Sequence, residues 1–198
     1  QPGPGGGVTD RPGSNGIRNE VYDWVTQNLP KVQTELLITN AYLIPETQGV
    51  AVLDDLVAAG AEVTIHTNSL SSHDVPAVNS HYKVWRKPIL ESGVSLFEAR
   101  YDASIKTSIV DTKPISARYM GLHSKSLVMD RRFAVIGSAN LDPRSAFLNS
   151  EVIAIIDSHS LADELAQAIL LDTSAANSWE VSLNEKNKII WSNDVESV

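Results

Sequence analysis

The sequence predicts a layered α/β domain, in which helices flank a mixed, largely parallel β-sheet. Short apolar segments alternate with segments of helical periodicity along most of the chain, and Gly or Pro residues separate many of them. The chain has 198 residues, 42% of them hydrophobic and 20% charged, which is enough for one substantial core. Strands that alternate with helices at this spacing are typical of parallel pairing.

The first 16 residues, QPGPGGGVTDRPGSNG, differ from the rest because Gly and Pro dominate them. We expect a flexible tail or interdomain linker there. Apolar residues then recur at helical spacing: Ile17, Val21, Trp24 and Val25. A helix is expected in this region, with Ser14 or Asn15 available as its N-cap. Residues 17–198 are accordingly predicted to form one domain.

Strands and helices then alternate as far as residue 98. Buried strands are expected at three apolar segments: Glu35–Leu43, Glu62–Thr67 and Val94–Glu98. Helices are expected between them, over Val50–Ala59 and Val78–Ser92. Each is followed by a glycine that would end it, and Pro88 is expected to kink the second helix.

The C-terminal half begins with an irregular segment, Tyr101–Gly121, which has no clean period. Strands are expected after it at three segments: His123–Met129, Phe133–Ile136 and Glu151–Asp157. A helix near Leu161–Leu171 follows, and two weaker strand-like segments lie around Trp179–Leu183 and Lys188–Trp191. No internal repeat is visible in the sequence.

Composition excludes several classes of protein. The chain has no cysteine, which rules out disulfides, thiolate zinc sites and a cysteine nucleophile. Its net charge of −8 weakly disfavours a general nucleic-acid binder. No apolar run approaches the roughly 18–20 residues of a membrane span, and no signal peptide is visible. Because the first residue is Gln, we expect a processed product or a segment of a longer protein.

The segment from His123 to Glu151 carries the candidate chemistry. On a strand, His123 and Lys125 project to the same side and lie close together. A histidine beside a fixed ammonium group suits an anionic phosphate, because lysine holds the charge while the imidazole attacks or transfers a proton. Asp130 has the opposite parity and lies at a turn, so it is interpreted as structural or as supporting the site.

Two further groups follow in the chain. The loop Gly137-Ser138-Ala139-Asn140 comes directly after an apolar strand and offers backbone N–H groups, a hydroxyl and an amide to a phosphodiester. Ser138 and Asn140 are therefore candidate phosphate-binding residues, beside Lys125. Glu151 begins the next strand and could accept a hydrogen bond from His123 Nδ1, which would fix the tautomer with Nε2 facing phosphorus.

The arrangement His123-x-Lys125-x4-Asp130-x6-Gly137-Ser138-x-Asn140 resembles the HxKxxxxD…GSxN motif of the phospholipase D superfamily, with no departure in spacing. The run LDPRSAFLNSE that follows is similar to the bacterial cardiolipin synthase and phospholipase D-like branch. Further upstream stretches resemble that branch as well: AYLIP, TNSLSSHDVPAV and the region of Lys87-Pro88. The resemblance covers roughly residues 35–157.

The resemblance implies a phospholipase D-like half-domain and a two-step phosphodiester transfer. One histidine attacks phosphorus to form a phosphohistidine, a second protonates the leaving alcohol, and neither a metal nor a cofactor takes part. The catalytic set carried over is His123, Lys125, Asp130 and Glu151. This sequence has one copy of the motif, so a second half must come from the same longer chain or from a homodimer partner. His81-Tyr82-Lys83 has the H-x-K form but lacks the aspartate and the Gly-Ser-x-Asn sequence of the motif. We interpret it as a chance match, a decoy, within a predicted helix.

We expect the C-terminal half of a two-motif enzyme, and the role of His123 stays open between nucleophile and general acid. The resemblance further implies a phospholipid substrate, peripheral contact with a bacterial membrane on its cytoplasmic or periplasmic side, and no nucleic-acid partner. Two alternatives remain: a single-motif homodimeric nuclease-type phosphodiesterase, and an isolated domain that is catalytically incomplete.

Overall fold

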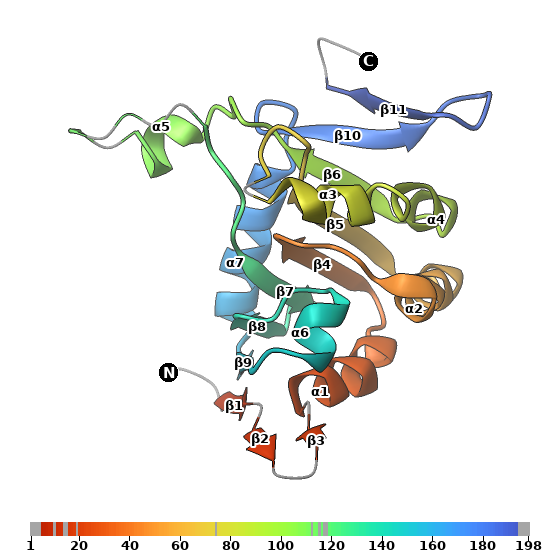
Figure 1. The fold of residues 1–198 in the computed structure, drawn as a ribbon, viewed down its shortest axis with the longest axis vertical. Coiled ribbons are helices and arrows are strands. Elements are labelled where there is room, and N and C mark those ends of the chain that lie inside the picture. Colours follow the sequence, from red (N-terminus) through yellow and green to blue (C-terminus); the bar gives the residue numbers. More distant parts are fainter. Residues whose placement is uncertain are drawn as a thin grey trace.

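Among the described residues, nine strands form one continuous sheet in the computed structural model of the chain (Figure 1). The structure describes residues 5–9, 11–13, 16–18, 20–73, 75–111, 113–114, 116 and 119–193. The strands of the large sheet, in spatial order, are β1 (Gly5–Thr9), β9 (Val152–Asp157), β8 (Phe133–Gly137), β7 (Lys125–Met129), β4 (Glu35–Asn40), β5 (Glu62–Asn68), β6 (Ser95–Ala99), β10 (Ser178–Leu183) and β11 (Ile189–Ser192). A small separate ribbon pairs β2 (Arg11–Gly13) with β3 (Gly16–Arg18).

The sheet is mixed, as predicted, but the prediction that it is largely parallel is wrong. Parallel pairing is confined to β4 with β5 and β5 with β6. The other pairs in the sheet are antiparallel. The strand–helix–strand pattern holds for β4, β5 and β6, where helical connections return the chain so that consecutive strands run in the same direction. After β6 a long segment brings β7 in beside β4 from the opposite direction. A tight turn then joins β7 to β8, and a longer connection joins β8 to β9, so both pairs are antiparallel.

Helices cover both faces of this sheet (Figure 1). Their bounds are α1 (Glu20–Asn28), α2 (Glu46–Ala58), α3 (Pro76–Tyr82), α4 (Arg86–Glu91), α5 (Lys106–Ile109), α6 (Pro143–Phe147) and α7 (His159–Asp172), with a 3-10 turn η1 (Leu29–Lys31) after α1. The larger apolar core joins α1, α2 and α4 to one face through residues such as Leu36, Ile38 and Leu53. On the opposite face, α7 packs Ala162, Ala166 and Ile169 against the alternate residues of the central strands.

The helix predicted over Val78–Ser92 is in fact two helices, α3 and α4, interrupted around Val84. Pro88 does not kink the second helix, because it lies in the first turn of α4, where a missing N–H breaks no helical hydrogen bond. A continuous helix would press the Pro88 ring against the carbonyl group of Val84, which explains why the break precedes the proline.

Within the segment expected to be a flexible tail or linker, the structure places Gly5–Thr9 as strand β1. It pairs with β9 from Gly5 opposite Ile156 to Thr9 opposite Val152. Backbone hydrogen bonds hold this edge strand, so its glycines need no apolar pattern. The predicted N-caps Ser14 and Asn15 lie outside the described residues. The helix expected from Ile17 begins at Glu20.

Candidate functional site

The motif residues gather at one edge of the sheet, where β4 and β8 end and the antiparallel β7 begins. Asn40, the last residue of β4, is the register partner of Lys125, the first residue of β7. Gly137 ends β8 beside them. His123 lies two residues before β7 rather than inside the strand predicted for it, and its side chain is exposed. This edge therefore presents His123, Lys125 and the Gly-Ser-x-Asn loop together.

Lys125 and His123 are held beside each other by the backbone and by Tyr42. Lys125 Nζ donates a hydrogen bond to the His123 carbonyl oxygen at 2.7 Å and lies 5.7 Å from the centre of the Tyr42 ring. The His123 ring meets Tyr42 edge-on, with 6.4 Å between centroids, and the His73 ring stacks on Tyr42 at 5.7 Å. Tyr42 thus presents one aromatic surface to the imidazole and to the ammonium group.

The Gly-Ser-x-Asn loop is anchored by Asn40, which is only 2% exposed. Asn40 Nδ2 donates to the Ala139 carbonyl oxygen at 3.3 Å, and Asn40 Oδ1 accepts from Leu141 N at 3.1 Å. Gly137 is required where the loop leaves β8, because a Cβ atom there would lie far inside van der Waals contact of the Val152 carbonyl oxygen. The loop conformation therefore depends on a buried amide in a strand distant in sequence.

Glu151 is buried at 7% exposure and gathers hydroxyl and amide donors from the same region. Its carboxylate accepts hydrogen bonds from Ser138 Oγ, from Ser145 Oγ at 2.9 Å and from Asn149 Nδ2 at 3.0 Å. Ser145 Oγ in turn accepts from Asn140 N at 3.1 Å. Buried carboxylates need such donors, and these bonds fasten the loop to β9 and α6. The proposed bond from His123 to Glu151 stays a prediction.

The structure also shows how the two phosphate-binding candidates of the loop are arranged. Ser138 Oγ gives its hydrogen to Glu151 and accepts from Val152 N at 3.1 Å, so contact with a phosphate would require the hydroxyl to turn. Asn140 Oδ1 is buried and has no hydrogen-bond partner among the residues that the structure describes. Because the O and N atoms of an amide are distinguished by their partners alone, this side chain can present an N–H group after a flip.

Asp130 is not brought to this edge. It lies beyond the far end of β7, with φ of 52°. Its carboxylate accepts from the backbone N–H groups of Gln33, Thr34 and Glu35, the closest at 2.8 Å. These bonds tie the turn after β7 to the start of β4, which fixes the two strands whose other ends carry Lys125 and Asn40.

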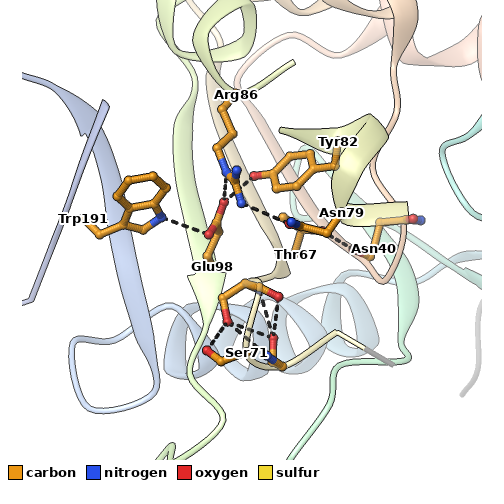
Figure 2. A network of polar contacts seen from close by, with 10 residues as sticks. Asn40, Thr67, Ser71, Asn79, Tyr82, Arg86, Glu98 and Trp191 are labelled. Carbon is orange, nitrogen blue, oxygen red and sulfur yellow. Dashed lines mark hydrogen bonds and ion pairs between the residues drawn. The ribbon is translucent and has the colours of Figure 1, made fainter. Parts of the chain in front are cut away.

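A row of buried polar residues continues from Lys125 and Asn40 across the parallel strands. Thr67 Oγ1 donates to the Asn40 carbonyl oxygen at 2.8 Å, and Glu98 is the register partner of Thr67. Glu98, 1% exposed, accepts from Tyr82 Oη at 2.8 Å and Trp191 Nε1 at 2.9 Å and pairs with the Arg86 guanidinium (Figure 2). This network ties α3, α4 and β11 to β6, and we interpret it as structural.

Sequence reasoning missed three residues that support the site: Asn40, Tyr42 and Ser145. Tyr42 belongs to the AYLIP run, which was noticed only as a resemblance. Ser145 follows Asp142-Pro143, and this pair could have predicted α6, because Asp142 Oδ1 caps the helix by accepting from Ser145 N at 2.7 Å. His81, in the incomplete H-x-K match, lies on the helix α3, as expected, and its side chain is exposed.

A cavity of about 180 Å³ adjoins the site, between the sheet and α1, α2 and α6. Lys125, Asn40 and Asn140 line it, and most of the remaining lining is apolar. The site thus combines a cationic and amide-bearing end with an apolar wall.

This fold and this arrangement define a phosphodiesterase domain of the phospholipase D type. Residues 25–170 match the family described as "Cardiolipin synthase, PLD-like domain", and the chain belongs to this family. It is 33% identical to cardiolipin synthase C of Escherichia coli over 154 residues, which are 78% of this chain and 32% of that protein. It is 28% identical over 173 residues to an uncharacterized protein of Helicobacter pylori, covering 86% of this chain and 32% of that protein. The chain spans about a third of the length of these relatives.

Two solved structures share the fold at low sequence identity. Phosphatidylserine synthase of Haemophilus influenzae superposes with a TM-score of 0.64 at 15% identity, covering 93% of this chain and 41% of that one. Nuc of Salmonella typhimurium, a phospholipase D family member, gives 0.62 at 16% identity, covering 88% of this chain and 97% of that one. Within the part of the chain that is described, no helix has the length and apolar character of a membrane span.

Proposed function

We propose that the chain is half of an enzyme that transfers or hydrolyses phosphodiesters of phospholipids, in the manner of a cardiolipin synthase, and that it works with a second His-Lys half. The observation that carries this proposal is the meeting of His123, Lys125 and the Gly-Ser-x-Asn loop at one edge of the sheet, beside an apolar cavity. The 33% identity to cardiolipin synthase C supports phospholipid as the substrate class.

The proposed reaction has two steps. In the first, the Nε2 atom of one histidine attacks phosphorus, and the bond to the leaving alcohol breaks as the histidine of the other half gives that oxygen a proton. In the second, the same histidine takes a proton from water or from an alcohol, whose oxygen attacks phosphorus and releases the first imidazole. His123 performs one of these two roles. Lys125 and Asn140 stabilise the negative charge on the phosphoryl oxygens.

Peripheral contact with a membrane belongs to the same proposal. Phe147 and Leu148, at the end of α6, are 51% and 71% exposed, and Phe147 also lines the cavity beside Lys125. An aromatic and an aliphatic side chain next to a phosphate site suit entry into the boundary between lipid headgroups and acyl chains. Sedimentation with phosphatidylglycerol vesicles tests this, and the double change Phe147→Ser with Leu148→Ser is expected to reduce the bound fraction.

The activity test compares three proteins on phosphatidylglycerol vesicles: the wild type, His123→Ala, and His81→Ala as a matched control from the decoy on α3. Each is assayed as the isolated chain over a range of concentrations and within the full-length protein that carries it. We expect His123→Ala to lower turnover by about 10²–10⁴-fold, while His81→Ala behaves like the wild type. Turnover that survives His123→Ala would remove this histidine from the mechanism.

The isolated chain separates the two sources of the second half. Activity that rises with the square of chain concentration, together with a dimer in gel filtration, would indicate a homodimer. A monomer that is inactive alone but active in the longer protein would indicate a partner half within the same chain. Hydrolysis of DNA in preference to phospholipid by such a dimer would favour the nuclease-type alternative.

A further inference from the structure

The lining of the cavity beside Lys125 changes from polar to apolar within two residues along the strands. At the edge of the sheet its wall is formed by Lys125 and its register partner Asn40, and Asn140 also lines it. Two residues further along, Leu127 faces Ile38, and both line the same cavity. Side chains two apart share a face at a spacing of about 7 Å. The cavity thus has a polar end and an apolar wall within the length of a small amphiphile.

The apolar wall is formed by helices as well as by the sheet. Val21 and Val25 of α1, Val52 of α2 and Phe147 of α6 close over the strands. The volume of about 180 Å³ slightly exceeds that of an engineered apolar cavity of about 150 Å³ that stays dry and binds benzene. An apolar cavity of this size is therefore able to hold several methylene groups.

The charges around the cavity favour an anionic head at its polar end. Lys125 is the basic residue among those that line it. Two acidic residues also line it, but Asp142 is engaged in capping α6, and Glu46 is exposed at the start of α2. Asn140 also lines the cavity, and its Oδ1 atom is buried without a partner among the described residues. A flip of this amide would direct an N–H donor to a phosphate oxygen.

We propose that this cavity is the subsite for the apolar part of the substrate, and that it receives the first methylenes of one acyl chain while Lys125 and Asn140 hold the phosphate. This inference rests on the proposed function, since it assigns a lipid to the same phosphate site. It gives the domain a physical basis for preferring lipid phosphodiesters over those of nucleic acids, whose ribose and bases present polar edges to such a wall.

Binding of two simple phosphate esters to the wild-type chain tests the proposal without catalysis. Methyl phosphate and hexyl phosphate carry the same head and differ in alkyl length. Each buried methylene contributes about 0.8 kcal/mol, or roughly a fourfold gain in affinity. Burying two of the five additional methylenes would therefore make hexyl phosphate bind more than about tenfold tighter. Titrations followed by NMR give both dissociation constants and show which methyl groups respond.

Variants that fill the cavity locate the effect. Val25→Phe and Val52→Phe place a larger side chain in the cavity from α1 and α2, and Val84→Phe makes the same change at a residue that is 60% exposed and does not line it. We expect each filling variant to abolish the preference for hexyl phosphate and to leave methyl phosphate binding unchanged. Val84→Phe is expected to keep the preference. Thermal unfolding confirms that each variant is folded.

The outcomes separate this inference from the proposed function. Equal binding of the two esters by the wild type overturns the acyl subsite, whether or not the filling variants fold, and leaves the phosphate site standing. A preference for hexyl phosphate that persists in both folded filling variants places the alkyl chain elsewhere and also overturns it. If neither ester binds, the phosphate site itself fails, and the acyl subsite fails with it.

Discussion

The buried His66 makes the stability of this domain depend on pH in a way that can be calculated. His66 lies in β5, is 3% exposed, and its Nε2 is 3.1 Å from Ser178 Oγ. Ser178 Oγ donates to the Asp172 carbonyl oxygen at 2.7 Å, so the hydrogen between the two side chains belongs to His66 Nε2. Nδ1 is then the unprotonated atom, and it has no partner among the described residues. Burial lowers the pKa of His66 from 6.5 to about 4.

The direction of this pH dependence follows from the difference in proton binding between the folded and the unfolded chain. The unfolded chain binds a proton at His66 below pH 6.5, whereas the folded chain does not until about pH 4. The contribution of neutral His66 to the free energy of unfolding is therefore complete above pH 6.5 and is lost progressively as the pH falls to about 4. At 1.36 kcal/mol per pH unit, the loss from this residue is about 2 kcal/mol at pH 5.

Urea unfolding of the wild type and of His66→Asn at pH 7.5 and pH 5.0 measures this loss. Asparagine keeps an amide donor for Ser178 and does not titrate, so carboxylates that change protonation in this range affect both proteins alike. We expect the wild type to lose about 2 kcal/mol more than the variant between the two pH values. Equal losses of stability in the two proteins would show that burial does not hold His66 neutral.

Three further changes test the fold that positions the site. Glu98→Ala leaves the buried Arg86 guanidinium without its carboxylate and should cost about 3–5 kcal/mol in urea unfolding; a loss below 1 kcal/mol would show that the network is dispensable. Asp130→Ala removes the acceptor that joins the turn after β7 to β4 and should cost about 2 kcal/mol, whereas a catalytic role would lower turnover without loss of stability. Gly137→Ala forces the backbone away from Val152 and should cost about 1–3 kcal/mol; an unchanged stability and an unchanged β8–β9 pairing in NMR spectra would contradict the close approach.

Three strands of the large sheet start where the sequence predicted them. Strands β4, β5 and β8 begin at the predicted residues Glu35, Glu62 and Phe133. The direction of β7 could not be read in the same way, because an apolar strand has the same pattern whether its neighbour is parallel or antiparallel. Strand β1 carries no side-chain pattern at all, since three of its five residues are glycines and its pairing depends on the backbone.

The motif predicted which segment carries the candidate site, and the structure brings Lys125, His123 and the Gly-Ser-x-Asn loop to one edge of the sheet, but the motif did not reveal the residues that support them. His123 and Lys125 were expected on one strand, yet the strand begins at Lys125 and Tyr42 aligns the two side chains. Asn40 supports the loop from a strand about 100 residues away in sequence, a relation that no local pattern contains. The bonds that converge on Glu151 likewise arise from tertiary packing rather than from spacing.

A crystal structure of the chain soaked with tungstate tests whether this edge of the sheet binds a phosphoryl group, because this oxyanion resembles such a group and scatters X-rays strongly. We expect tungstate at the end of β7, within hydrogen-bond distance of His123 Nε2 and Lys125 Nζ, and we expect it to be absent when His123 and Lys125 are both changed to Ala. Tungstate bound elsewhere while this edge of the sheet stays empty, or bound there equally well in the double variant, would contradict this expectation.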